Sequence, residues 1–294
     1  MKPKLFIFDI SNFIHRAFHG MGSDLTTDDG FPTGAIYGVL SMMSKFIKKE
    51  RPEHMLICYD YQGQMASLRK CMYPEYKANR GPAVNAVSSQ ELVIRELLKL
   101  LDMHGIEMPG YEADDLIGMA VDQFKDKYAI TIMTGDKDLF VLIDDGAAVC
   151  VHDSLKRQTF REAEAIAKFG VKPHQISDYL AIVGDTSDNI KGIPGLGKKA
   201  AEILLSKYES IEDIYESIED HTPTIKKKLI AGKADAFMSA KLTRLIKTSV
   251  KITPDEIRFN PQPDQRLLTI LQRLQFSRSL GMITDIWKLY KKRV

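Results

Sequence analysis

Apolar runs that end in an acidic residue are the feature that most constrains how this chain can fold. The first two runs are short and unbroken, which is typical of a strand buried on both faces of a parallel sheet, and the third alternates isoleucine with threonine. The carboxyl ends of parallel strands meet at one edge of the sheet, so acids far apart in the chain can converge there. The sequence therefore predicts an α/β protein with a central, mostly parallel sheet flanked by helices. The runs and their acids are residues 5–8 with Asp9, residues 55–59 with Asp60, and residues 128–133 with Asp136 and Asp138.

Residues 110–115 (Gly-Tyr-Glu-Ala-Asp-Asp) add a fourth acidic group, where an extended segment gives way to a helical pattern. Acids at a helix start have a simple structural explanation, because the free N–H groups of the first turn attract negative charge. One or two acids satisfy that attraction. Three crowded carboxylates repel one another and raise one another's pKa unless a cation neutralises them. Taken alone, the stretch is compatible with either a helix start or a metal site.

Composition limits the class of protein. The chain has 294 residues, 44% of them hydrophobic and 27% charged, which is ordinary for a globular protein. No apolar run reaches the roughly 18 residues of a membrane span, and no cleavage site follows the first residues, so we expect neither membrane association nor a signal peptide. The three separated cysteines indicate reduced thiols in a cytoplasmic protein. The net charge of +2 hides separate acidic and basic segments, which could hold metal and phosphate respectively.

Nine carboxylates become candidates for one site when Asp185 and Asp188, spaced to share a helical face, are added. A cluster of this charge requires divalent cations, and oxygen ligands favour Mg²⁺, with Mn²⁺ able to substitute, over zinc. Two such ions about 3.5–4 Å apart clamp the attacking and leaving oxygens of a phosphodiester. Any single acid could equally be a turn or cap residue, so the prediction depends on the recurrence at strand ends. The candidates are Asp9, Asp60, Glu112, Asp114, Asp115, Asp136, Asp138, Asp185 and Asp188.

Residues 192–201 (Gly-Ile-Pro-Gly-Leu-Gly-Lys-Lys-Ala-Ala) predict a helix-hairpin-helix. Its glycines allow a tight turn, and the N–H groups at the start of the next helix can bind a phosphate without reading a base. An ordinary helix–helix turn with solvated lysines is the alternative. Residues 73–80 combine tyrosines with Lys77 and Arg80, which suits single-stranded nucleic acid, although a solvated loop explains that stretch as well.

Three structural units are expected along the chain. Residues 15–34 predict a loop, because His15, Arg16, His19 and a Gly/Asp-rich run interrupt the apolar pattern. From about residue 160 the pattern changes to short helices, and residues 254–263, rich in proline, predict a linker. The predicted units are an α/β metal-binding domain over residues 1–170, a helical subdomain that carries the helix-hairpin-helix over 171–255, and a C-terminal helical segment over 256–294 that packs back on the first.

The order of these motifs closely resembles the 5′-nuclease (flap endonuclease) family, which includes the N-terminal domain of bacterial DNA polymerase I and free-standing phage 5′-exonucleases. The resemblance covers roughly residues 4–250. It implies a PIN-like fold with a helical arch or clamp at about residues 65–90, and a free-standing monomer, in the host cytoplasm if phage-encoded. The motifs are residues 73–80 (Tyr-Pro-Glu-Tyr-Lys-Ala-Asn-Arg), 110–115, 134–138 (Thr-Gly-Asp-Lys-Asp), 184–189 (Gly-Asp-Thr-Ser-Asp-Asn) and 192–197.

The resemblance also implies roles for the matching residues. One departure is Ile10, where the family usually has glycine after the first aspartate. Lys77 and Arg80 would stabilise charge on the scissile phosphate. The first metal ion would be held by Asp9, Asp60, Glu112 and Asp114, and the second would be held or oriented by Asp115, Asp136, Asp138, Asp185 and Asp188. DNA would be contacted by Arg69, Tyr76 (stacking on a base), Gly192, Gly195, Gly197, Lys198 and Lys199, and K⁺ by the backbone carbonyls of Lys191, Ile193 and Leu196.

These expectations combine into a Mg²⁺-dependent 5′-nuclease acting at 5′ ends or flaps of DNA, or on RNA primers, in replication or repair. Its partners would be flap, nicked or gapped duplex and a replicative polymerase or single-strand-binding protein. Two other classes stay open: a non-catalytic module for branched DNA, and another metal phosphotransferase, such as a toprim-like or haloacid-dehalogenase-like enzyme. The intact acids count against the first, and the hairpin with the Tyr/Lys/Arg stretch counts against the second. The sequence leaves open the balance between exonuclease and flap-endonuclease activity.

Overall fold

The computed structural model describes residues 2–20, 25–81 and 85–291. Within these residues, six strands form one sheet in the order β3-β2-β1-β4-β5-β6. The first five strands run parallel and β6 is antiparallel to β5, so the predicted mostly parallel sheet is confirmed. The strands are β1 (Lys4–Asp9), β2 (Met55–Cys58), β3 (Gly105–Ile106), β4 (Ala129–Met133), β5 (Val149–Asp153) and β6 (Gln158–Phe160).

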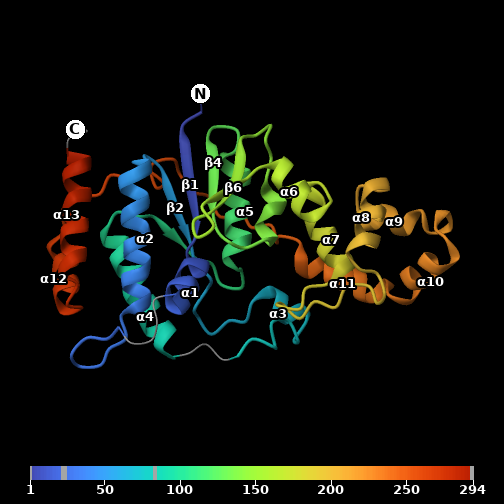
Figure 1. Ribbon diagram of the computed structural model, residues 1–294, viewed down its shortest axis with the longest axis horizontal. Helices are drawn as coiled ribbons and strands as arrows, with labels where there is room; N and C mark the ends of the chain where they lie inside the picture. The colour runs from blue at the N-terminus through green and yellow to red at the C-terminus, as the bar shows by residue number, and fades with distance from the viewer. Residues whose placement is uncertain (1, 21–24, 82–84, 292–294) are drawn as a thin grey trace.

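The central strand β1 is buried on both faces because its side chains alternate between two hydrophobic cores. Leu5 and Ile7 point into the first core, and Phe6 and Phe8 into the second. α5 and α6 cover the first core, whereas α1, α2 and α4 cover the second (Figure 1). The helices of this part are α1 (Ile10–Gly20), α2 (Gly34–Glu50), α3 (Leu68–Met72), α4 (Asn85–Leu100), α5 (Ala113–Phe124), the 3-10 helix η1 (Asp138–Leu142) and α6 (Glu162–Phe169).

A second group of helices continues the first core beyond the sheet. α7 buries Ile176, Leu180 and Ile182 in that core. In Figure 1 the following helices extend away from the sheet, on the side opposite α13, and form the predicted helical subdomain. The elements are η2 (Pro173–Gln175), α7 (Ile176–Val183), α8 (Lys198–Lys207), α9 (Ile211–Glu216), η3 (Ile218–Asp220), α10 (Pro223–Ala231) and α11 (Lys233–Thr243).

The C-terminal segment returns to the sheet. The Phe259 N–H donates to the Glu53 carbonyl at 2.8 Å, which ties the returning chain to the start of β2. α12 (Gln265–Arg273) and α13 (Ser277–Lys291) then bury Leu267 and Ile283 in the second core, beside α2 and α4. None of the described helices combines the length and the apolar character that crossing a membrane would need.

The predicted loop over residues 15–34 is wrong in its first part, because α1 continues to Gly20. Ile10, Phe13, Ile14 and Ala17 form an apolar stripe at helical spacing, and all four are buried. The polar residues that suggested a loop lie on the other face of this helix. Residues 21–24 of the predicted loop lie outside the described residues.

The described part of the predicted arch, residues 65–81 and 85–90, contains the short α3, a series of turns and the first residues of α4, and its action as an arch stays a prediction. Residues 82–84 lie outside the described residues. The turns are held against the loop at 184–190: the Lys77 N–H donates to the Asp188 carbonyl (3.0 Å), and the Asn189 side chain donates to the Glu75 carbonyl (2.7 Å). Lys77 adopts a left-handed backbone conformation (φ 55°), which is uncommon outside glycine and is fixed here by that loop.

Candidate active site

The strand order places the first acids together. β1 and β4 are neighbours where the strand order changes direction, which is where open α/β sheets bind ligands. Asp9 ends β1, and its Oδ2 accepts from the hydroxyl of Thr134, directly after β4, at 2.7 Å. The Asn12 N–H donates to Asp9 Oδ1 (3.1 Å), and the Asn12 side chain accepts from the Gly135 N–H (3.1 Å). The start of α1 and the loop after β4 are therefore fixed around one carboxylate.

Asp60, Asp114 and Asp136 join Asp9 at this edge, and we call these four residues the first acidic group. Asp60 follows β2, and its Oδ1 accepts from the Ala113 N–H in the first turn of α5 (2.9 Å). Burial and then the charges of Asp136, Asp9 and Asp60 raise the pKa of Asp114 well above its ordinary value. The four carboxylates therefore lie within electrostatic reach of one another, although their sequence positions are far apart.

This group is costly to ionise without a cation. Burial raises the pKa of Asp9 to about 7, the Thr134 hydrogen bond opposes this, and repulsion from Asp60 adds to it. An aspartate with such a pKa is largely protonated at mildly acidic pH, whereas bound positive charge would favour the carboxylate form.

Asp138, Asp185 and Asp188 form a second acidic group beside the first. Asp136 links the two groups, since its Oδ1 accepts from the Asp138 N–H at 3.0 Å. Burial, followed by repulsion from Asp136, raises the pKa of Asp138 to about 7. Within the described part of the chain, Asp138 Oδ1 is buried and has no hydrogen-bond partner, so it offers a free acceptor.

Lys137 is a site residue that the sequence analysis missed. Its Nζ lies 3.0 Å from Asp185 Oδ2. Asp185 Oδ1 accepts from the Ser187 N–H (2.9 Å) and the Ser187 hydroxyl (2.7 Å). Burial opposes the charge of Asp185, but Ser187 and Lys137 outweigh it and lower the pKa of Asp185. The position of this lysine between Asp136 and Asp138 was the available sequence signal.

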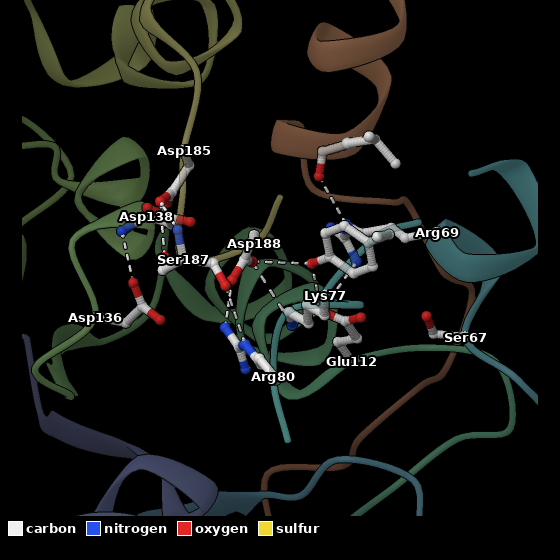
Figure 2. A network of polar contacts seen from close by, with 12 residues as sticks. Ser67, Arg69, Lys77, Arg80, Glu112, Asp136, Asp138, Asp185, Ser187 and Asp188 are labelled. Carbon is white, nitrogen blue, oxygen red and sulfur yellow. Dashed lines mark hydrogen bonds and ion pairs between the residues drawn. The ribbon is translucent and has the colours of Figure 1, made fainter. Parts of the chain in front are cut away.

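Lys77 and Arg80 reach the acids from the turn segment (Figure 2). Lys77 Nζ lies 2.7 Å from Glu112 Oε2 and 3.8 Å from Asp188 Oδ2. Arg80 is ion-paired with Asp188. Burial opposes the charge of Glu112, but Lys77 and then Arg69 outweigh it and lower the pKa of Glu112. In the view of Figure 2 the two cations lie between Glu112 on one side and Asp136 and Asp138 on the other.

Asp115 belongs to neither acidic group, which corrects its predicted role as a metal ligand. Arg69 donates to both oxygens of Asp115, at 2.8 and 2.7 Å, and both side chains are buried. The same oxygens accept from the Glu112 N–H (3.1 Å) and the Ile246 N–H (2.7 Å), so the carboxylate is fully engaged. The other donors of Arg69 bind two backbone carbonyls at the end of α11. Arg69 is only 4% exposed, so its predicted contact with DNA is wrong as well.

Replacing Asp115 with asparagine should destabilise the protein without removing a metal ligand. Breaking a buried ion pair costs about 3–5 kcal/mol, but Glu112 lies 3.8 Å from Arg69 and keeps part of the interaction. We therefore expect Asp115→Asn to lower the free energy of unfolding by about 2 kcal/mol in urea denaturation. Asp122→Asn, at an exposed position of the same helix, should change it by less than about 0.5 kcal/mol. Unchanged stability of the Asp115 variant would return this residue to the candidate metal ligands.

Tyr76 is buried, which corrects its predicted stacking on a base. Its side chain is 3% exposed. The hydroxyl lies within hydrogen-bond distance of Glu112 Oε2 (3.1 Å) and Asp188 Oδ2 (3.2 Å), and it can donate to either. Burial, and then the charge of Glu112, raise the pKa of Tyr76, so the hydroxyl keeps its proton. Lys77 Nζ lies 4.9 Å from the centre of the ring, and Tyr76 therefore positions Lys77 together with both acids.

The predicted hairpin lies between α7 and α8. Gly192 and Gly195 have positive φ angles of 69° and 79°. A side chain at Gly192 would collide with the backbone of residues 183–184, so this turn requires glycine. Lys228 Nζ donates to the Gly195 carbonyl at 2.8 Å and supports the turn from α10. Lys198 and Lys199 are exposed at the start of α8. Binding of DNA by Gly192, Gly195, Gly197, Lys198 and Lys199, and of K⁺ by the carbonyls of Lys191, Ile193 and Leu196, stays a prediction.

Arg16, which the sequence analysis placed in a loop without a role, supports the loop after β4. It binds Asp153 at the end of β5 through two contacts of 2.8 and 3.3 Å. Its guanidinium fills the space beside Gly135, where a side-chain methyl group would collide with it. Burial opposes the charge of Asp153, but Arg16 outweighs it and lowers the pKa of Asp153 to about 2.

The Arg16–Asp153 ion pair should make the free energy of unfolding depend on pH in the acidic range. A folded pKa of about 2 lies below the unfolded value of about 3.9, so the stabilisation is complete above about pH 4 and is lost as the pH falls toward 2. Asp153→Asn should lower the free energy of unfolding by roughly 1–2 kcal/mol at neutral pH and by much less near pH 2. Urea titrations of both proteins across this range measure the effect. If the two proteins differed in free energy of unfolding by the same amount at every pH, the charge of Asp153 would not be the source of the stabilisation.

The donor set fits hard divalent cations. Both acidic groups offer carboxylate oxygens, which Mg²⁺ and Mn²⁺ prefer. Across residues 2–20, 25–81 and 85–291, no three acidic, histidine or cysteine side chains stand close enough to enclose an ion. Cations instead hold Glu112, Asp185 and Asp188. The free Asp138 oxygen and the raised pKa values of Asp9, Asp114 and Asp138 show where added positive charge would be favourable. These residues therefore fit divalent cations in their chemistry. Their side chains would have to rotate to enclose an ion.

Carboxylates gather at the carboxyl edge of the parallel sheet, with Lys77 and Arg80 beside them and a helical subdomain next to the sheet, an arrangement that suits metal-dependent chemistry on phosphodiesters. Comparison with known proteins specifies the family. The model of the 5′-3′ exonuclease N-terminal resolvase-like domain matches residues 4–170, and that of the 5′-3′ exonuclease C-terminal SAM fold matches residues 171–265. The chain therefore belongs to the 5′-3′ exonuclease family, as the sequence resemblance indicated.

Two relatives agree with this assignment. The 5′-3′ exonuclease of Aquifex aeolicus is 35% identical over 290 residues, which cover 98% of this chain and 96% of that protein. DNA polymerase I of Caldicellulosiruptor bescii is 37% identical over 279 residues, which cover 93% of this chain. The chain spans only 32% of the length of that polymerase.

Solved structures share the fold at low sequence identity. A complex of the bacteriophage T5 flap endonuclease with DNA and metal ions superposes with a TM-score of 0.68 at 18% identity, covering 98% of this chain and 99% of that one. Flap endonuclease-1 from Methanococcus jannaschii superposes with a TM-score of 0.61 at 13% identity, covering 100% and 94%. Both confirm the fold of the sheet and the helical subdomain.

Proposed function

We propose that this nuclease hydrolyses DNA with two divalent cations, Mg²⁺ or in its place Mn²⁺, at 5′ ends and flaps. The observation that carries the proposal is the pair of adjoining acidic groups. Asp9, Asp60 and Asp114, with Glu112, would hold one ion, and the second acidic group the other, with Asp136 between them. Ions bound there supply the positive charge that activates a water molecule and stabilises the leaving oxygen of a phosphodiester.

Lys77 and Arg80 are the residues of this chain best placed to meet the scissile phosphate. Both neutralise acids of the site, Glu112 and Asp188, through short ion pairs. A phosphodiester oxygen offers the same negative charge, so either cation can exchange its carboxylate partner for substrate without being left unpaired. Divalent ions held by the acidic groups would neutralise Glu112 and Asp188 in place of Lys77 and Arg80, which would leave these two side chains available to the phosphate.

The helical subdomain would hold the duplex next to the cleaved strand. The exposed Lys198 and Lys199 stand at the N-terminus of α8, where free N–H groups favour a phosphate. We propose that K⁺ binds the carbonyls of Lys191, Ile193 and Leu196. The Ile193 carbonyl accepts one bond from the Leu196 N–H (3.0 Å) and keeps a second lone pair.

The units of the chain and its partners follow from the same proposal. Residues 1–170 would form the catalytic unit, and residues 171–255 would bind the duplex. Residues 256–294 would stabilise the first unit by packing against it. The T5 flap endonuclease was solved with DNA and metal ions, and the catalytic core of Rad2 with a DNA substrate, which supports flap, nicked or gapped DNA as substrate. We propose a monomer that works in the cytoplasm with a replicative polymerase or single-strand-binding protein.

Incubation with a 5′-flap duplex tests this function. The flap strand is labelled at its 5′ end in one sample and at its 3′ end in another. Each sample is incubated once with Mg²⁺ and once with a chelator in place of Mg²⁺. We expect cleavage near the junction with Mg²⁺ alone, and product sizes separate single-nucleotide release from flap removal. Tight binding of the flap duplex without cleavage at any Mg²⁺ or Mn²⁺ concentration would instead make the chain a binding module for branched DNA.

A further inference from the structure

Among the described residues, the helices that cover β1 and β2 on the α2 side of the sheet do not extend over β5 and β6. The second core takes in side chains from β1 and β2 but only Met133 from β4, and it includes no residue of β5 or β6. A trough of about 770 Å³ lies there, between α2 and the strands β4 to β6. Residues of the two acidic groups do not line it, so among the described residues it is separate from the candidate active site.

The trough has an apolar wall and a floor of small side chains. Phe46 of α2, partly exposed, forms the wall and packs edge-on against Phe6, with ring centres 4.9 Å apart. Thr131, Cys150 and Thr159, from three neighbouring strands, line the floor. Short side chains leave depth above the strands, and a volume of this size can take up two or three large apolar side chains.

Both rims of the trough are cationic. Lys45 and Lys49 stand one turn apart on α2, and Arg157 and Arg161 flank β6 on the opposite rim. All four are exposed. Within the described residues Glu50 is the one acid that lines the trough, and it lies 3.4 Å from Lys49. The trough therefore carries a net positive charge around an apolar centre.

We propose that this trough binds an acidic peptide segment of a partner protein, one that carries a large apolar side chain between its acids. The acids would pair with the two rims, and the apolar side chain would fill the space beside Phe46. A nucleic-acid strand fits less well, because single strands bind on exposed aromatic faces, and the ring of Phe46 is already packed against Phe6. The assignment goes beyond the nuclease activity, since it gives the enzyme a site for recruitment to other proteins.

A short labelled peptide tests the site. The probe is fluorescein-Glu-Asp-Phe-Glu-Asp-Leu-Glu, titrated with the full chain and followed by fluorescence anisotropy, with and without saturating 5′-flap DNA in Ca²⁺. We expect binding that DNA does not displace. The Lys45→Glu/Arg157→Glu variant should bind at least about tenfold more weakly, because an acid replaces one of the two cations on each rim and cancels the charge of the other. The control Lys99→Glu, which reverses one charge at an exposed position of α4, should bind the peptide as the unchanged protein does.

Two further measurements test the apolar centre of the trough and the integrity of the rim variant. A peptide with serine in place of phenylalanine and leucine should lose about tenfold in affinity if the apolar centre is used. Flap cleavage by the rim variant should be unchanged, which shows that the fold and the active site are intact. The proposal is overturned if the peptide does not bind, if DNA displaces it, or if the rim variant binds it equally well. It is also overturned if a labelled single-stranded oligonucleotide, and not the peptide, loses its binding in the rim variant.

Discussion

Asp136→Ala is expected to abolish cleavage of a 5′-flap duplex while DNA binding in Ca²⁺ persists. Asp136 contributes to the raised pKa of Asp9 and Asp114 in one acidic group and of Asp138 in the other. Removal of this carboxylate should therefore weaken the binding of both ions. We expect single-turnover cleavage to fall more than about 10³-fold, beyond the 10–100-fold typical of losing an outer partner of a ligand.

The matched control for this variant is Asp126→Ala, at an exposed acid just after α5. It changes the net charge by the same amount and should cleave like the unchanged protein. Flap affinity in Ca²⁺, measured by anisotropy, should stay within about threefold in both variants, because phosphate contacts come from the cations and not from Asp136. Normal turnover by Asp136→Ala would refute the assignment of this residue between two ions.

Lys77→Ala is expected to slow the chemical step far more than it weakens binding. Lys77 is ion-paired with Glu112 and held by the ring of Tyr76, so it is pre-positioned at the acids. Loss of one such charged donor to a developing negative charge costs about 10²–10³-fold in rate. Single-turnover rates at saturating enzyme measure this directly, and the dissociation constant for flap DNA in Ca²⁺ measures binding.

Lys70→Ala serves as the control for Lys77, because it removes an exposed lysine from the same segment. Its rate should change by less than about twofold, since exposed phosphate contacts act mainly on binding. A Lys77 variant that is weak in binding but normal in rate would make this lysine a DNA contact only. An unchanged rate together with unchanged binding would remove it from the site.

The sheet and its acidic edge could be predicted because the relevant signals are local. Unbroken apolar runs identify buried strands, and parallel pairing alone brings Asp9, Asp60 and Asp136 to one edge. The cluster at residues 110–115 was ambiguous by itself, and the structure divides it. Glu112 and Asp114 face the site, whereas Asp115 belongs to the buried pair with Arg69.

The misassigned residues depend on contacts between distant segments. Arg69 and Tyr76 lie in a basic, aromatic stretch that suggests an exposed surface for DNA. Their burial arises only when α11 and the loop at 184–190 close over them. The role of Arg16 depends likewise on Asp153, 137 residues further along the chain. Composition within a short window carries no signal for such pairs, so the sequence favoured the exposed interpretation in each case.

Anomalous diffraction from crystals soaked in Mn²⁺ tests the central claim most directly. We predict two ion peaks, one among Asp9, Asp60 and Asp114 and one among Asp138, Asp185 and Asp188, with Asp136 adjacent to both. The Asp136→Ala crystal should lose or weaken both peaks, and Asp115 should remain bound to Arg69 in each. A single peak, or ions bound away from these acids, would contradict the two-ion account.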